Sequence, residues 1–69
     1  MKIGALVRLE DFGYRRLHVA TDIDGGKFNL EEIDCGKVAI ITGLPRKGAV
    51  QVLFDDKIRY VNPEQCVEL

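Results

Sequence analysis

The stretch from Gly36 to Leu69, GKVAIITGLPRKGAVQVLFDDKIRYVNPEQCVEL, decides the predicted fold of this 69-residue chain. It is a series of short runs rich in β-branched and aromatic residues, and each run ends in a turn signal. Lys37 to Thr42 is apolar on both faces, which is typical of a central strand. Pro45 to Gly48 then predicts a turn into a second strand, Ala49 to Phe54.

Two further elements complete the same stretch. Asp55-Asp56 predicts a turn into a third strand, Lys57 to Val61. Asn62 to Gln65 is typical of an Asx turn or of a single helical turn, and Cys66 to Leu69 predicts a short closing strand. The second half of the chain is therefore expected to be a set of antiparallel strands with one helical turn before the last.

The first half of the chain also carries strand patterns. Ile3 to Glu10 alternates between apolar and polar residues, with Leu6 as an apolar exception on the polar face. Residues 11–16 are polar and aromatic and predict a loop. Leu17 to Ile23 alternates again and runs into Asp24-Gly25-Gly26, a hairpin signal because both glycines accept positive φ.

A return arm is expected after this turn, at Lys27 to Leu30. The residues that follow are open to two interpretations. Asn29 and Glu32 have the spacing of a capping box, so Leu30 to Asp34 forms either one helical turn or more strand.

Composition describes one small globular domain, residues 1–69, with 46% apolar and 30% charged residues. No apolar run has the length of a membrane span, and the N-terminal residues lack the apolar core of a signal peptide, so we expect a soluble cytoplasmic protein. The net charge of −1 supplies no general attraction to a polyanion.

This order of elements resembles the Src-homology-3-like small β-barrel. The segment YVNPEQCVEL, Tyr60 to Leu69, is similar to the helical turn and terminal strand of that fold, and residues 11–34 take the place of its first long loop. The runs GKVAIITG and AVQVLFDDKIRYV also look like short barrel proteins encoded by tailed phages and like nucleic-acid-associated barrels of ribosomal and transcription factors. The resemblance implies an all-β barrel of five to seven short, mostly antiparallel strands with a one-turn helix before the last strand.

The residue types present in the chain give little support for a catalytic function. The chain contains no serine, one histidine and no tryptophan, so a serine triad is excluded and recognition of proline-rich ligands is not expected. A Cys–His pair would need His18 to approach Cys35 or Cys66, and there is no C-x-x-C motif for zinc. We expect a non-enzyme with two free thiols, no metal and no cofactor or small-molecule substrate; a redox role for Cys35 and Cys66 is the least favoured alternative.

Surplus apolar residues favour a binding or assembly module. We expect them on the second faces of the strands, where the candidate interface residues are Leu6, Ala39, Ile41, Leu53 and Val61. Either residues 11–34 fold back over this face, or a second copy of the chain or a larger protein covers it, face to face or by strand addition at an edge.

A local basic and aromatic patch supports an alternative, binding of nucleic acid. Its candidate residues flank one loop and the tip of one hairpin: Tyr14, Arg15, Arg16, His18, Arg46 and Lys47. An aromatic ring for base stacking beside cations for phosphate is the required chemistry. Aspartates in neighbouring loops reduce the positive field of this patch.

Overall fold

The structure, a computed structural model, describes the backbone of residues 2–24, 27–46 and 48–69, and their side chains except those of residues 22–28 and 44–47. The described residues form strands and one short 3-10 helix, which confirms the predicted all-β class. The elements are β1 (Leu6–Leu9), β2 (Arg16–Asp24), β3 (Lys27–Asp34), β4 (Lys37–Arg46), β5 (Ala49–Phe54), β6 (Lys57–Val61), η1 (Pro63–Gln65) and β7 (Cys66–Glu68).

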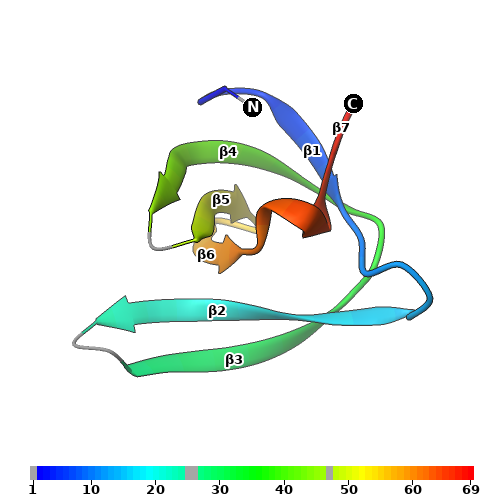
Figure 1. Cartoon of the computed structure of the whole chain (residues 1–69), viewed down its shortest axis with the longest axis horizontal. Coiled ribbons are helices and arrows are strands. Elements are labelled where there is room, and N and C mark those ends of the chain that lie inside the picture. Colours follow the sequence, from blue (N-terminus) through cyan, green and yellow to red (C-terminus); the bar gives the residue numbers. More distant parts are fainter. Residues whose placement is uncertain (1, 25–26, 47) are drawn as a thin grey trace.

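All strands belong to one antiparallel sheet with the order β3-β2-β6-β5-β4-β1-β7. The sheet curls, so that the hairpin of β2 and β3 lies on one side of the molecule and β1 and β4 lie on the other (Figure 1). β3 and β7 are the two edge strands and do not pair with each other. The sheet is therefore open, and the closure that a barrel requires is not seen among the described strands.

One face of the curled sheet forms the hydrophobic core. In β1 and β5 every second side chain is buried. The alternation predicted for Ile3 to Glu10 is confirmed within β1 only, because the strand begins at Leu6 and Ile3 is exposed. Full burial of an aliphatic side chain contributes on the order of 1.5–3 kcal/mol, so this face supplies most of the folding free energy. The buried apolar residues are Val7, Leu9, Leu17, Val19, Ile33, Ala39, Ile41, Val50, Val52, Phe54 and Val61.

The hairpin of β2 and β3 answers two questions that the sequence left open. β3 is a strand up to Asp34, so the helical turn considered for Leu30 to Asp34 is wrong. Strand pairing is favoured over a helical turn because Leu17 and Ile33, which lie directly opposite each other, are both buried in the core. The hairpin thus covers the inner face of the other strands and not their outer face.

Two turns lie at their expected positions, whereas β4 continues through Pro45 and Arg46, where the sequence predicted a turn. Asp55 and Asp56 have φ values of 50° and 61° and connect β5 to β6 as a two-residue hairpin turn. In η1, the Asn62 N–H donates to Gln65 Oε1 at 3.0 Å, and the Gln65 N–H donates to the Asn62 carbonyl at 2.9 Å. The expected glycine turn at residues 25–26 lies outside the described residues, but Asp24 and Lys27 on either side of it are paired.

Candidate functional site

A row of aliphatic side chains crosses the outer face of the sheet. Leu6 lies opposite Ile40, Ile40 lies opposite Leu53, and Leu53 lies opposite Ile58, so the four residues form one line across β1, β4, β5 and β6. Leu6, Ile40 and Ile58 are 49%, 41% and 39% exposed, and Leu53 is half-buried. We call these four residues the outer apolar row.

The outer apolar row results from strands that are apolar on both faces. In β4, Ala39 and Ile41 point into the core, so Ile40 between them must point outward. In water this row contributes little to folding, because its side chains keep much of their exposed surface. Large contiguous apolar patches on protein surfaces are typical of interaction sites.

A polar row runs beside the apolar one on the outer face. The Thr42 hydroxyl donates to Gln51 Oε1 at 3.1 Å, and Gln51 Nε2 donates to the Tyr60 hydroxyl at 3.2 Å. These bonds connect β4, β5 and β6 two residue pairs along from the outer apolar row, at the next position on the same face. On the other side of the row, Arg8 Nε lies 2.9 Å from Glu10 Oε1. The apolar row is therefore bordered by polar residues on one side, and on the other side by Arg8 and the exposed Val38 opposite it.

Three of the five candidate interface residues were predicted to lie on the outer face, and for these three the prediction is wrong. Ala39, Ile41 and Val61 are 2%, 0% and 2% exposed and belong to the core. Both faces of these strands carry apolar residues, so alternation alone does not show which face is buried. In β4 the buried face is determined by the pairing of Ala39 with the buried Val7 of β1. Leu6 and Leu53 do face outward, and the sequence reasoning missed Ile40 and Ile58.

The buried side chain of Arg59 explains why the sequence did not indicate that Ile58 faces outward. Its side chain turns into the protein and is 4% exposed, which forces its neighbour Ile58 outward. Glu31 binds the guanidinium through two contacts, from Nε to Oε2 and from Nη2 to Oε1, both 3.2 Å. Arg59 Nη1 also donates to the Phe54 carbonyl at 2.6 Å, and its guanidinium carbon lies 3.7 Å from the centre of the Phe54 ring. These contacts compensate a buried cation, and the bond from Arg59 lowers the pKa of Glu31.

A groove of about 300 Å³ adjoins this buried arginine. It lies at the edge of the sheet formed by β3, and it is mainly charged. We call it the edge groove; its lining residues are Arg16, Glu31, Glu32, Ile33, Asp34, Lys37, Phe54, Asp55 and Arg59.

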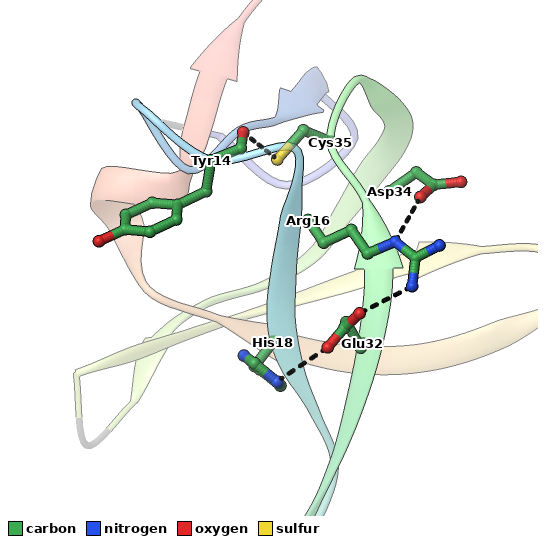
Figure 2. A network of polar contacts seen from close by, with 6 residues as sticks. All are labelled: Tyr14, Arg16, His18, Glu32, Asp34 and Cys35. Carbon is green, nitrogen blue, oxygen red and sulfur yellow. Dashed lines mark hydrogen bonds and ion pairs between the residues drawn. The ribbon is translucent and has the colours of Figure 1, made fainter.

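The predicted nucleic-acid patch is only partly assembled, because Arg16 and His18 contact carboxylates of β3 (Figure 2). Tyr14 is 72% exposed and Arg15 is also exposed. Arg16, however, lies 2.9 Å from Glu32 and 3.2 Å from Asp34, and the His18 ring lies 3.5 Å from Glu32. These carboxylates raise the pKa of Arg16, and Arg16 lowers the pKa of Glu32. The charge of Arg16 is therefore largely balanced within the protein.

The remaining patch residues lie where no side chain is described. The backbone of Arg46 pairs with Ala49, but its side chain is not described, and Lys47 lies outside the described residues.

Both cysteines are free and half-buried beside the core. The Cys35 thiol donates to the Tyr14 carbonyl at 3.3 Å (Figure 2), and burial raises the pKa of the Cys66 thiol. A raised pKa keeps that thiol protonated at neutral pH, which does not suit a nucleophile. No group of three or more potential metal ligands occurs in the described part of the chain. Within the same residues, no helix is long and apolar enough to cross a membrane.

Comparison with known proteins found no counterpart: no family model matches the sequence, and no curated protein or solved structure matches it significantly.

Proposed function

We propose that this protein is a non-catalytic assembly module that associates with a second copy of itself through the outer apolar row. The observation that carries the proposal is the register of Leu6, Ile40, Leu53 and Ile58, which aligns four aliphatic side chains across four adjacent strands. Removing such a row from water on association is favourable by about 25 cal/mol for each Å² of apolar surface.

The row is self-complementary in a two-fold arrangement. If the axis passes between Ile40 and Leu53, then Ile40 meets Leu53 of the second copy, and Leu6 meets Ile58 of that copy in the same way. Each contact joins one leucine and one isoleucine and brings no charges together. The net charge of −1 adds little repulsion between copies.

Face-to-face contact is favoured over strand addition between copies. Glu31, Glu32 and Asp34 occupy three of the last four positions of the edge strand β3. In pairings centred on this half of β3, the carboxylates of two copies face each other, which is unfavourable. The other edge strand, β7, has only three residues.

At the level of fold, we propose a Src-homology-3-like small barrel. Support comes from the element order: a first strand, a long hairpin, three tightly turned strands, a 3-10 turn and a short last strand. The antiparallel pairing of β7 with β1 and of β1 with β4 fits the same topology.

The proposal extends to location. We propose a cytoplasmic protein, and the two free thiols support this because such a compartment keeps cysteines reduced.

The solution mass tests the proposed function. Light scattering over a series of concentrations is expected to give a molar mass that rises from that of one chain, 7.7 kDa, toward twice that value. A mass that stays at 7.7 kDa up to millimolar concentration contradicts self-association. A charged residue at Ile41 is unsuitable as a test variant, because Ile41 is fully buried and its replacement would unfold the chain.

A second candidate function, binding of single-stranded nucleic acid, rests on the loop before β2. There the rings of Phe12 and Tyr14 are 75% and 72% exposed, and Arg15 is exposed beside them. Exposed rings stack on bases and an arginine contacts phosphate. Salt-sensitive binding that is lost in a Tyr14→Ala, Arg15→Ala variant would support this function; no retention of labelled oligonucleotide at low salt would remove it.

A further inference from the structure

The edge groove lies along the free edge of β3. Four consecutive residues of this strand, Glu31 to Asp34, line the groove. Successive side chains of a strand point to opposite faces of its sheet, so a hollow that all four reach must lie at the strand's edge. This agrees with the topology, in which β3 pairs only with β2 among the described strands (Figure 1).

Backbone groups of β3 point into the same space. The Cys35 N–H donates to the Arg15 carbonyl at 2.8 Å, so Arg15 and Cys35 form a hydrogen-bonded pair. In an antiparallel ladder, pairs with and without hydrogen bonds alternate. Counting from Cys35 along the register, the N–H and C=O groups of Ile33 point toward β2, and those of Glu32 and Asp34 point toward the free edge. The edge therefore offers donors and acceptors at the spacing of a strand.

The groove has a floor and an opposite wall. Ile33 and Phe54, each 7% exposed, supply an apolar floor. Lys37, the first residue of β4, and Asp55, in the turn after β5, supply the wall that comes from other segments. Glu31 and Phe54 hold Arg59 in place at one side, so this part of the lining is already ordered. Such a floor accepts the apolar side chains of an added strand.

The charges of the groove select the partner. The lining contains three cations, at Arg16, Lys37 and Arg59, and four carboxylates, at Glu31, Glu32, Asp34 and Asp55. Arg59 is bound by Glu31, and Arg16 is bound by Glu32 and Asp34. Neither Asp55 nor Lys37 takes part in the described ion pairs, so the lining keeps an excess of one negative charge. The excess negative charge favours a cationic partner and disfavours β3 of a second copy, which would bring more carboxylates.

We propose that the edge groove binds an extended basic peptide segment as an added strand on β3. The backbone of the peptide pairs with Glu32 and Asp34, its apolar side chains lie over Ile33 and Phe54, and its lysine or arginine side chains meet the carboxylates. This site is on a different part of the protein from the outer apolar row and does not depend on self-association.

The test uses the full chain and three capped probe peptides: Ac-KVKVKV-NH2, Ac-EVEVEV-NH2 and Ac-KPKPKP-NH2. Titration of the isotope-labelled protein with the first peptide, followed by amide resonances, is expected to give saturable shifts at Glu32 and Asp34 and slower hydrogen exchange of both amides. The acidic peptide tests the charge argument and the proline peptide tests backbone pairing, because proline has no N–H. We expect both control peptides to bind at least about tenfold more weakly.

Two variants at position 32 distinguish the contribution of the backbone to peptide binding from that of the side chain. Glu32→Pro removes the outward N–H and leaves the ladder with β2 intact, whereas Glu32→Ala removes only the side chain. We expect Glu32→Pro to weaken binding by about tenfold or more and Glu32→Ala by about threefold or less.

Three results overturn the proposal. They are no saturable shifts at Glu32 and Asp34 up to millimolar Ac-KVKVKV-NH2, binding of either control peptide as tight as that of Ac-KVKVKV-NH2, and shifts that map only to the outer apolar row. The wild-type titration decides the question even if Glu32→Pro fails to fold.

Discussion

The guanidinium of Arg59 and the carboxylate of Glu31 form a two-point contact at 3.2 Å, although only the Glu31 side chain is substantially exposed, at 37%. This asymmetry makes the two partners unequal. Without Glu31 the Arg59 cation stays buried and loses its counter-ion, whereas without Arg59 the Glu31 carboxylate can be hydrated.

Loss of Glu31 should therefore be more harmful than loss of Arg59. We expect Glu31→Ala to lower the melting temperature by on the order of 10 °C, and Arg59→Met to lower it by only a few degrees, because methionine keeps an apolar stem against Phe54. Thermal unfolding followed by circular dichroism measures both. The double variant should resemble Arg59→Met; if Glu31→Ala is the milder change, Arg59 is not the group that needs compensation.

Acid should weaken the fold through Glu31 and Glu32. Their hydrogen bonds to Arg59 and Arg16 lower the pKa of both carboxyls from the ordinary value of 4.5. For such groups the stabilisation is complete above the unfolded pKa and is lost as the pH falls through the lower folded pKa. The melting temperature should thus be flat from pH 7 to about pH 5 and should fall below about pH 4.5.

The variant Glu32→Gln provides the control for the acid effect. It removes one of the two titrating groups, so its melting temperature should depend less on pH in the acid range than that of the wild type. An unchanged acid dependence in Glu32→Gln would show that Glu32 does not contribute.

Adjacent isoleucines on β4 should respond differently to the same change. Ile41 is fully buried and Ile40 is 41% exposed, so Ile41→Val should cost about 0.5–1.5 kcal/mol of unfolding free energy and Ile40→Val less than about 0.5 kcal/mol. Urea unfolding at low protein concentration, where association is minimal, measures the difference. Equal costs would mean that the inward and outward faces of β4 are assigned wrongly.

The strand positions could be predicted from the sequence because turn residues bound almost every run. Asp55-Asp56 and Asn62 to Gln65 mark turns whatever surrounds them, since the signal is local. Alternation in β5 also identified its buried face, because Gln51 is the only strongly polar residue of that strand and points outward.

Sequence alone could not determine which face of β4 or β6 is buried. Ala39 and Ile40 are both apolar, and the choice between them depends on pairing with β1, a contact between residues far apart in the chain. In β6 the buried residue is an arginine, and its partner Glu31 lies 28 residues away. No local pattern indicates that a cation will be compensated in this way, so Val61 was predicted on the outer face although it is buried.

Self-association through the outer apolar row is tested most directly by sedimentation equilibrium of three proteins at high micromolar concentration. Wild type and Leu30→Glu, a control that charges an apolar residue 60% exposed on β3, should both show an average mass above 7.7 kDa. Ile40→Glu places a carboxylate in the middle of the row and should remain at 7.7 kDa while keeping the wild-type circular dichroism spectrum. A folded Ile40→Glu protein that associates as strongly as wild type would contradict the proposed interface.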